Sequence, residues 1–403
     1  MRILVINSGS SSLKFQLMNM IDREILCKGL IERIGSAEGT FTYSRGNGEK
    51  IVETREIPDH ETAISLALQA ITDPQAGVIK DLSEIDAVGH RIVHGGEKIK
   101  KSEFLTDEII RIIQDCVRLA PLHNPANLLG VKALKKLLPD VPHIGVFDTA
   151  FHTTMPEKAY IYPLAYEYYK KHGIRRFGFH GTSHHYVSLR AAEILGIKPD
   201  KFNCITCHFG NGVSISAIQN GKSVDTSLGF GTMAGVPMGT RAGDLDPDII
   251  LYLIDQLKMS VTEVRHLIYK NSGLKGLSGL TNDMRDIVEA ALAGKKRPKL
   301  ALRIFTRSAR KMIGAMATVL EGKLDAIIFT AGIGENNVEV RAMVCEGLEI
   351  LGARIDLQKN LIRGKEGIIS TDDSRIKLMV VPTNEELMIA LETEALAQGA
   401  RKN

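Results

Sequence analysis

The feature that most constrains the fold is a unit that occurs twice: an apolar strand, a short turn rich in glycine and asparagine, and a returning strand. One copy spans residues 2–18 and the other spans residues 203–219. Each copy predicts a β-hairpin, because two apolar runs flank a short turn of residues that tolerate tight backbone geometry. Strand-like and helix-like segments alternate along the rest of the chain, which indicates the α/β class. The repetition suggests two related units, one in each of two domains.

The same patterns predict the remaining elements. Further strands are expected at 24–34, 86–93, 143–147, 222–226, 326–330 and 377–381. Helices are expected at 63–71, 107–119, 127–138, 247–258, 261–271, 283–293, 300–320 and 385–398. The chain has 403 residues, more than one hydrophobic core usually supports, so two domains are expected. We place them at residues 1–150 with 386–403, and at residues 151–385.

Composition excludes several classes of function. The net charge is +4 and tryptophan is absent, so no basic, aromatic surface for nucleic acid is indicated. No run of 18 apolar residues occurs, and the apolar stretch at the N-terminus is too short for a secretory signal, so we expect a cytoplasmic protein that does not enter a membrane. The five cysteines are scattered and odd in number, which argues against a disulfide scaffold. Cys204 and Cys207 form C-x-x-C inside a predicted strand, where they point to opposite faces and read as structural.

The first turn, residues 7–14, could contact phosphate. Gly9 permits tight backbone geometry, Ser10 and Ser12 offer hydroxyl groups, and Lys14 adds a positive charge. No G-x-x-x-x-G-K pattern is present and no helix follows, so this is not a P-loop. A serine-rich turn taken alone is more often a solvated hairpin.

Two further glycine-rich segments are candidates for phosphate or nucleotide contacts. In residues 208–212, Asn211-Gly212 predicts a two-residue type I′ turn, and the glycines let backbone approach an anion. Residues 331–336 follow a buried strand and predict a loop where α/β folds bind ligands. Each of these segments alone is also compatible with an ordinary turn.

Charged and polar residues are expected at the ends of several strands or in loops. A carboxylate directly after a buried strand is costly unless it is paired or bound to metal. Two arginines, two carboxylates and several histidines in such positions suit phosphoryl transfer, in which cations spread the charge and carboxylates hold Mg²⁺. The set comprises Arg91, His123, Asp148, His180, Arg241 and Glu385.

Taken together, the ordered motifs resemble the acetate kinase (acetokinase) family, within the superfamily of sugar kinases, heat-shock chaperones and actin. The resemblance runs essentially end to end, through residues 7–14, 90–96, 120–125, 147–152, 175–184, 208–212, 238–247, 329–336 and 382–386. It implies two RNase H-like (actin-like ATPase) domains, each a mixed sheet flanked by helices, with the active site in the interdomain cleft. It also implies an acyl-substrate role for the N-terminal domain, and nucleotide binding and dimerisation for the C-terminal domain.

The resemblance assigns roles residue by residue. Asn7 and Glu385 match positions that hold Mg²⁺, with Asp148 close to the metal and the nucleophile. Arg91 and Arg241 match the clamps on the carboxylate and the phosphoryl group, and His180 matches a donor to the phosphoryl oxygens. The catalytic set is thus Asp148, His180, Arg241 and Arg91, with Ser10, Ser12 and His123 as further active-site residues. Nucleotide contacts are implied for Lys14, His208, Phe209, Gly210, Asn211, Gly212, Asp283, Met284, Arg285, Gly332, Ile333, Gly334 and Asn336.

The acyl pocket is implied to consist of Val93, Leu122 and Phe179 next to Arg91. At one position the chain departs from the family, because Thr232 stands where the family usually has a pocket proline. One methyl group in such a pocket discriminates by only ~1–3 kcal/mol, so a propionate or butyrate kinase remains an alternative to an acetate kinase. A non-catalytic, ATP-switched protein of the actin or chaperone type and a pyrophosphate-dependent kinase are more distant alternatives.

The resemblance implies reversible, direct in-line transfer of the γ-phosphoryl group of ATP to acetate, giving acetyl phosphate and ADP. It implies Mg²⁺ as the metal, with Mn²⁺ as a possible replacement. It further implies a homodimer formed through the C-terminal domain.

Overall fold

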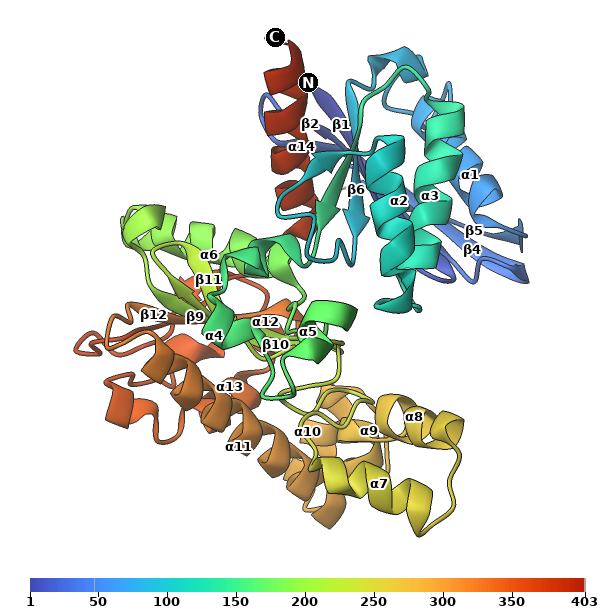
Figure 1. Ribbon diagram of the computed structural model, residues 1–403. Helices are drawn as coiled ribbons and strands as arrows, with labels where there is room; N and C mark the ends of the chain where they lie inside the picture. The colour runs from blue at the N-terminus through green and yellow to red at the C-terminus, as the bar shows by residue number, and fades with distance from the viewer. Residues whose placement is uncertain (47, 402–403) are drawn as a thin grey trace. The chain divides into compact units, whose positions relative to one another are not determined.

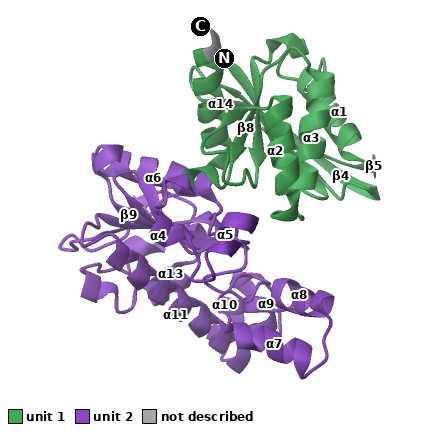
Figure 2. Ribbon diagram, viewed as in Figure 1, with its two compact units in different colours: residues 1–151, 384–403 green, residues 152–383 purple. Residues whose placement is uncertain are grey.

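The chain forms two compact units, shown in different colours in Figure 2. A computed structural model describes residues 1–46 and 48–401. Unit 1 comprises residues 1–151 and 384–403, and unit 2 comprises residues 152–383. The second border differs from the expected one, which placed Glu385 in the C-terminal domain. Glu385 is the first residue of α14 (Glu385–Arg401), and this helix packs against β1, β6 and β8 of unit 1.

Unit 1 contains an eight-stranded mixed sheet in the order β5-β4-β3-β2-β1-β6-β8-β7 (Figure 1). Strand β1 pairs antiparallel with β2 and parallel with β6, and β6 pairs parallel with β8. The carboxyl ends of β1, β6 and β8 therefore meet at one edge of the sheet. The strands are β1 (Arg2–Ser8), β2 (Ser12–Asn19), β3 (Glu24–Glu32), β4 (Ser36–Arg45), β5 (Lys50–Ile57), β6 (Ala87–Ile92), β7 (Glu103–Phe104) and β8 (His143–Phe147).

Helices cover both faces of this sheet (Figure 1). Because side chains alternate along a strand, Leu4 and Ile6 of β1 join a core with α1 (His60–Thr72) and α3 (Asn124–Leu137). Ile3 and Val5 point the other way and pack with Ile389 and Ala390 of α14. Helix α2 (Asp107–Asp115) packs beside α3. The alternation in one short strand thus supplies two cores.

Unit 2 repeats the central strand order with a six-stranded sheet, β11-β10-β9-β12-β14-β13. As in unit 1, an antiparallel three-stranded meander (β9 to β11) continues into parallel strands (β12 and β14). Every residue of β9 and β12 is buried. This shared order confirms the expectation of two related hairpin units. The strands are β9 (Cys204–Phe209), β10 (Val213–Gln219), β11 (Lys222–Thr226), β12 (Ala326–Thr330), β13 (Gly367–Ile368) and β14 (Lys377–Val380).

The helices of unit 2 surround this sheet and extend from one end of it (Figure 1). Helix α11 is 24 residues long and contacts α9, α10 and α13. Among the described residues, no helix combines the length and the apolar character that a membrane crossing requires. The helices are α4 (Glu157–Tyr160), α5 (Glu167–His172), α6 (Gly181–Leu195), α7 (Pro247–Asp255), α8 (Val261–Lys270), α9 (Gly273–Ser278), α10 (Met284–Leu292), α11 (Lys296–Val319), α12 (Ala331–Asn336) and α13 (Val338–Cys345).

Two local predictions were wrong. The hairpin between β9 and β10 does not contain a type I′ turn, because that turn needs positive φ at both central residues and neither Asn211 nor Gly212 has it. Its loop has three residues and is closed by a hydrogen bond from Gly210 N to Gly212 O (3.0 Å). The expected loop after β12 is instead the short helix α12, whose first residue, Ala331, has a φ of 61°.

Candidate functional site

In unit 1, three predicted residues meet at the carboxyl edge of the sheet. Asn7 lies near the end of β1, Arg91 lies in β6, and Asp148 directly follows β8. Arg91 donates to both carboxylate oxygens of Asp148, from Nε to Oδ1 (3.1 Å) and from Nη2 to Oδ2 (2.7 Å). Its third nitrogen, Nη1, lies 3.5 Å from Oδ1 of Asn7. The guanidinium is thus oriented by two fixed partners on neighbouring strands.

Burial shapes the charges of this cluster. The Asp148 side chain is 2 % exposed, and that of Arg91 is 21 % exposed. Burial alone would lower the pKa of Arg91, but Asp148, Glu385 and Glu386 raise it above its ordinary value, so the guanidinium stays charged. Burial raises the pKa of Glu385, and the nearby Arg91 opposes that rise. The cluster therefore holds a permanently charged Arg91 beside Glu385, whose carboxyl group binds its proton more tightly than usual.

The residues expected to hold Mg²⁺ offer suitable ligand atoms. Asn7, Asp148 and Glu385 supply amide and carboxylate oxygens, which Mg²⁺ prefers. Among the described residues, no group of three or more His, Cys, Asp or Glu side chains is arranged to hold a metal alone. Mg²⁺ commonly binds through one or two carboxylates together with phosphate oxygens and water, so this donor set fits a metal that arrives with a nucleotide.

Hydrogen bonds from the protein hold the backbone of the turn after β1, while several of its side chains are exposed. Asn127 donates to Ser8 O (2.7 Å), and Nε2 of His60 lies 2.7 Å from Gly9 O. A Cβ atom at position 9 would lie 2.7 Å from Oγ of Ser12, so any other residue there would displace the Ser12 hydroxyl. The side chains of Ser10 and Lys14 are exposed and that of Ser12 is half-buried. This turn presents hydroxyl and ammonium groups on a rigid backbone.

The residues expected in the acyl pocket differ in exposure. Val93 is buried and its amide donates to Oδ1 of Asn127 (3.1 Å), whereas Leu122 is 58 % exposed. His123 occupies the position before the first turn of α3. Phe179 belongs to unit 2, where it is buried. Val93 and Phe179 are therefore buried in different units, whereas Leu122 is open to solvent.

In unit 2, His180 and Arg241 lie next to Gly212, and His208 stacks on His180. The rings of His180 and His208 stack with centroids 4.2 Å apart and an interplanar angle of 17°. A Cβ atom at Gly212 would lie 3.2 Å from Nε2 of His180 and 3.5 Å from Nη2 of Arg241. Glycine thus lets an imidazole edge and a guanidinium approach the same point of the β9–β10 hairpin.

The loop that carries Arg241 is tightly held. Arg241 Nη1 donates to Thr232 O (2.6 Å), and Met238 N donates to Arg241 O (3.0 Å). A Cβ atom at Gly273 would lie 2.5 Å from Arg241 O, so α9 can begin only with glycine against this loop. Burial lowers the pKa of Arg241 below its ordinary value. The side chain is therefore a preset, partly desolvated cation.

A network of hydroxyl and imidazole groups behind these residues was not predicted. Nδ1 of His180 lies 2.8 Å from Oγ of Ser214, and Nδ1 of His208 lies 2.8 Å from Oγ of Ser183. The motif at 175–184 contains two of these residues, but the strand residue Ser214 carries no signal in the sequence. Both histidines are therefore anchored through the same ring nitrogen.

A cavity of about 820 Å³ in unit 2 collects most of the residues predicted to contact the nucleotide. Its volume falls in the usual range for small-molecule sites. Arg285 and Asp283 form a double hydrogen bond at its wall (3.1 and 2.6 Å). The predicted residues that line it are Gly210, Asn211, Asp283, Met284, Arg285, Gly332, Ile333 and Asn336. Sequence reasoning missed Thr281, Asn282, Asp286, Asn337 and Arg363.

Other predicted nucleotide residues do not line this cavity. The Phe209 side chain is fully buried and packs against Phe305 and Phe329, with ring centroids 5.5 and 6.0 Å apart. Gly334 is buried too, and its carbonyl accepts a hydrogen bond from Nη1 of the buried Arg341 (2.9 Å). These two residues therefore support the cavity wall from behind.

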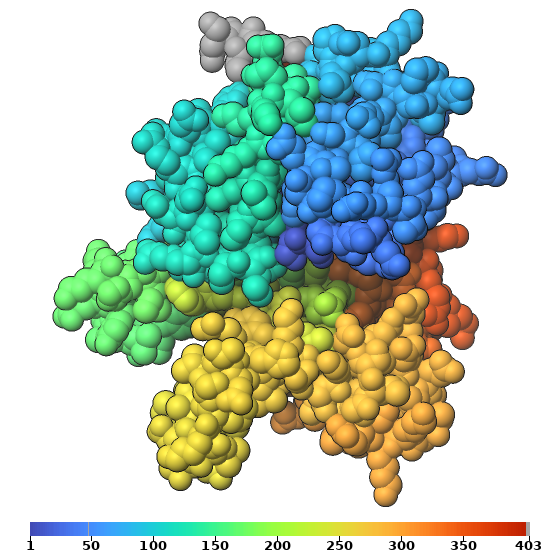
Figure 3. Space-filling model, turned by 90° about the vertical axis from the view of Figure 1, so that its right-hand side faces the viewer, coloured from blue at the N-terminus to red at the C-terminus, as the bar shows by residue number. Residues whose placement is uncertain are grey.

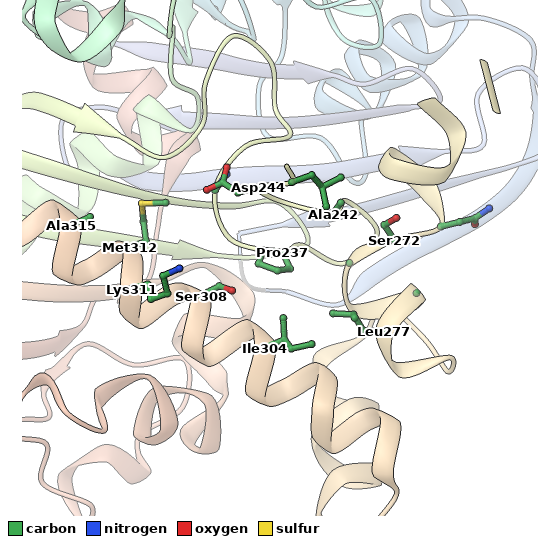
Figure 4. Close-up of a pocket in the computed structure, with 15 residues that line it drawn as sticks. Pro237, Ala242, Asp244, Ser272, Leu277, Ile304, Ser308, Lys311, Met312 and Ala315 are labelled. Atoms are coloured by element: carbon green, nitrogen blue, oxygen red, sulfur yellow. The ribbon is translucent and has the colours of Figure 1, made fainter. Parts of the chain in front are cut away.

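A second cavity, of about 700 Å³, lies between the Arg241 loop and α11 (Figure 4). Pro237, Ala242 and Asp244 of the loop face Ser308 and Lys311 of the helix across it. None of the predicted site residues lines it.

Burial raises the pKa of the Cys204 and Cys207 thiols in β9, which keeps them protonated and unreactive.

Comparisons with known proteins extend over almost the whole chain. The Acetokinase family matches residues 2–391. The chain is 54 % identical over 402 residues to the acetate kinase of Caldanaerobacter subterraneus, with 100 % of both chains covered. It is 56 % identical to the acetate kinase of a Thermotoga species, with 99 % of both chains covered.

Solved structures agree with these sequence matches. The crystal structure of Porphyromonas gingivalis acetate kinase superposes with a TM-score of 0.94 at 45 % identity, covering 98 % of this chain and 99 % of that one. A propionate kinase from Francisella tularensis superposes with a TM-score of 0.91 at 41 % identity, again covering 98 % and 99 %. The expected α/β class, with two mixed sheets flanked by helices, is thereby confirmed.

Proposed function

Because the chain belongs to the acetokinase family, whose members are phosphotransferases with a carboxyl group as acceptor, we propose that it transfers the γ-phosphoryl group of ATP reversibly to acetate. The products are acetyl phosphate and ADP. The observation that carries the proposal is the convergence of His180 and Arg241 on Gly212, because it sets an imidazole nitrogen and a guanidinium N–H at one point beside the stacked His208. Such a point suits the oxygens of a phosphoryl group in transfer.

The chemistry requires neutralisation of charge more than proton transfer. A carboxylate is already a nucleophile, so no general base is needed, but it must approach another anion. Arg91, fixed by Asp148 and Asn7, binds the carboxylate, while Arg241 and His180 bind the phosphoryl oxygens. The proposed reaction requires both sets of residues to act on one pair of substrates.

A divalent metal would complete this charge balance. Asn7 and Glu385 would hold Mg²⁺, or Mn²⁺ in its place, with Asp148 nearby. When bound, the metal would neutralise charge on the phosphate oxygens of the nucleotide. The protein's part is to keep the Glu385 carboxyl group ionised, which Arg91 favours against the effect of burial.

The nucleotide fits the cavity of unit 2 between the β9–β10 hairpin, α10 and α12. We propose that Asp283, Met284 and Arg285 contact the nucleoside, and that Gly332, Ile333 and Asn336 form the opposite wall. Gly210 and Asn211 lie on the same hairpin as Gly212, so the phosphates would extend from this cavity toward His180 and Arg241.

The relatives named acetate kinase favour acetate as the acceptor that we propose for this chain. Position 232 keeps propionate or butyrate kinase as the second candidate. Thr232 replaces the proline usual in the family, and its carbonyl binds Arg241. The similar propionate kinase structure supports the same alternative. A hydroxylamine-trapping assay with Mg-ATP and acetate, propionate or butyrate separates the two candidates. We expect most acyl phosphate from acetate; preference for a longer acid would favour the second candidate, and no product from any acid would contradict both.

The assignment of Arg241 has its own test. Arg241→Ala should lower kcat by about 10³-fold, as the loss of an arginine that stabilises a transferring phosphoryl group does elsewhere. Arg310→Ala is the control, since Arg310 donates to the carbonyl of Met343 in α13. A kcat near the wild-type value in Arg241→Ala would contradict the role.

We further propose a homodimer in the cytoplasm, where its nucleotide substrate is made and used. Helix α7 supports an assembly through unit 2, because none of its residues is buried although six of its nine are aliphatic or aromatic. Ile249, Leu251 and Tyr252 are 43, 56 and 57 % exposed. Residues of α7 and α8, coloured yellow in Figure 3, lie at the surface of unit 2. Covering such a surface in a dimer would remove it from water.

A further inference from the structure

A line of four polar side chains leads away from His180 into unit 2. Nδ1 of His180 lies 2.8 Å from Oγ of Ser214, and the same oxygen lies 2.7 Å from Nε2 of His184. Nδ1 of His184 lies 2.6 Å from Oγ1 of Thr206. Ser214, His184 and Thr206 have no solvent-exposed surface. Water therefore does not compete for these hydrogen bonds.

The fold brings these residues together from three elements, α6, β9 and β10. His180 and His184 are one helical turn apart at the start of α6, so their side chains lie on one side of the helix. Ser214 lies opposite His208 in the pairing of β10 with β9, and Thr206 lies two residues before His208 on the same face. Helix α6 packs on β9, which places both imidazole rings over this face.

Ser214 links the protonation of the two histidines. A serine hydroxyl has one hydrogen, so between two ring nitrogens it donates to one and accepts from the other. Burial lowers the pKa of His184 well below its ordinary value, so this ring is neutral and carries a single N–H. If Nε2 of His184 carries that proton, Ser214 accepts it and donates its own to Nδ1 of His180.

The other edge of the His180 ring faces the proposed phosphoryl site. Its Nε2 lies close to Gly212, beside Nη2 of Arg241. A lone pair at this nitrogen would repel phosphoryl oxygens, whereas an N–H would bind them. His180 also has a left-handed backbone (φ 56°), which is costly for a residue other than glycine. This conformation sets the direction in which its side chain leaves the backbone.

We propose that Ser214 and His184 are positioning residues that hold the proton of His180 on Nε2, directed at the transferring phosphoryl group. In this arrangement Thr206 donates to Nδ1 of His184, Nε2 of His184 donates to Ser214, and Ser214 donates to Nδ1 of His180. No covalent bond is made or broken in this line. Its effect on catalysis rests on the proposed function, whereas the tautomer of His180 does not.

The tautomer is tested directly by ¹⁵N NMR of the full chain labelled in histidine. Signals of His180 are assigned by their loss in His180→Gln. We expect the wild type to show His180 protonated at Nε2, and Ser214→Ala to show a mixture of both tautomers. Ser216→Ala is the matched control, because Ser216 is equally buried on the same face of β10 but bonds Thr226 (2.8 Å). A wild-type His180 protonated at Nδ1, or an unchanged spectrum in Ser214→Ala, would overturn the proposal.

Kinetics test the consequence for the reaction. Ser214→Ala should lower kcat about 10- to 100-fold, as removing partners that orient a histidine does at other sites, with little change in KM for ATP or the carboxylate. Ser214→Thr keeps the hydroxyl and should restore most of kcat, which guards against a general packing defect. The double variant with His184→Gln should be no slower than the slower single variant, because the residues act as one unit.

Two outcomes separate this proposal from the proposed function. Equal kcat values in Ser214→Ala and Ser216→Ala, in a wild type that makes acyl phosphate, would overturn the positioning role alone. A wild type without kinase activity would contradict the proposed function, and the NMR measurement would still decide whether Ser214 controls the tautomer.

Discussion

Arg91 in β6 donates two parallel hydrogen bonds, of 3.1 and 2.7 Å, to Asp148, which directly follows the adjacent parallel strand β8. The planar guanidinium matches the planar carboxylate, so the pair fixes the direction of the arginine as well as its charge. Its remaining nitrogen is turned toward Asn7. The orientation that the proposed carboxylate clamp needs is thus set before any substrate binds.

We therefore predict that Arg91→Lys is not a conservative change. Lysine keeps the charge but cannot form two parallel bonds, so KM for acetate should rise at least tenfold and kcat should fall by about 10²-fold. Arg190→Lys is the matched control, because Arg190 binds Glu366 through the same two nitrogens (2.9 and 2.6 Å) at an exposed site. Steady-state kinetics of both variants test this prediction. Wild-type values of kcat and KM in Arg91→Lys would contradict a role for Arg91 in binding the carboxylate.

Gly332 offers a test of the nucleotide cavity that leaves the fold intact. It lines the cavity, and no atom lies within 4 Å of the position of an added Cβ. Gly332→Leu should therefore fold normally and obstruct the cavity, raising KM for ATP about tenfold or more with little effect on KM for acetate. Gly314→Leu in α11, which also has open space around its Cβ, serves as the control. If nucleotide affinity measured by titration calorimetry is equal in the two variants, the nucleotide binds elsewhere.

Buried apolar runs between turns were the most predictable parts of the fold. Strands β8 and β12 occur at the predicted residues because such runs have clear ends. Strand β5 was missed because seven of its eight residues are exposed and no core marks it. Helix α6 was missed because its first turn is polar. Long-range packing, which a single sequence does not display, decides both.

The candidate site divides in a similar way. A buried carboxylate after a strand signals that a partner exists, and Asp148 has one, but the pattern does not say that the partner is Arg91. Ser214 and Thr206 look like ordinary strand residues, because their importance comes from the histidines that α6 brings over them. Leu122 was expected in a pocket on the strength of a motif alone, and its exposure depends on how the turn before α3 packs.

The proposed homodimer predicts a strong effect of charge on α7. Leu251→Glu should dissociate the dimer, because a carboxylate in an apolar interface must lose its hydration. Ile21→Glu is the control, since Ile21 is 86 % exposed in unit 1. Sedimentation velocity should give a dimer for the wild type and the control and a monomer for Leu251→Glu. A monomeric wild type at all concentrations tested would exclude the dimer.

The pKa of Glu385 predicts competition between protons and Mg²⁺. Burial raises this pKa, so the carboxyl group is protonated at a higher pH than an ordinary glutamate as pH falls. Since Mg²⁺ requires the ionised form, kcat/KM should fall on the acid side, and a tenfold higher Mg²⁺ concentration should move that fall to lower pH by up to about one unit. Glu385→Gln should lose Mg²⁺-dependent activity, while Glu394→Gln on the same helix should retain it. An acid limb that ignores Mg²⁺ would argue against Glu385 as a ligand.

His94 makes the stability of unit 1 depend on pH. The ring is fully buried, Nδ1 accepts a hydrogen bond from Gly96 N (2.9 Å), and burial lowers its pKa to about 4. An unfolded histidine has a pKa of about 6.5, so between these values the unfolded state binds more protons than the folded state. The contribution of His94 is therefore complete above pH 6.5 and is lost as pH falls toward 4, by about 2 kcal/mol at pH 5. Burial lowers the pKa of His90 and His143 in the same unit as well, which adds to the same trend.

We predict that urea unfolding will show a free energy that is nearly constant from pH 8 to 7 and falls steadily from pH 6.5 to 5. In His94→Asn this fall should be smaller, because the amide oxygen of asparagine can still accept from Gly96 N but does not titrate. His172→Asn, at the exposed end of α5, should follow the wild type. Parallel curves for the wild type and His94→Asn would mean that the His94 ring does not titrate between its folded and unfolded states.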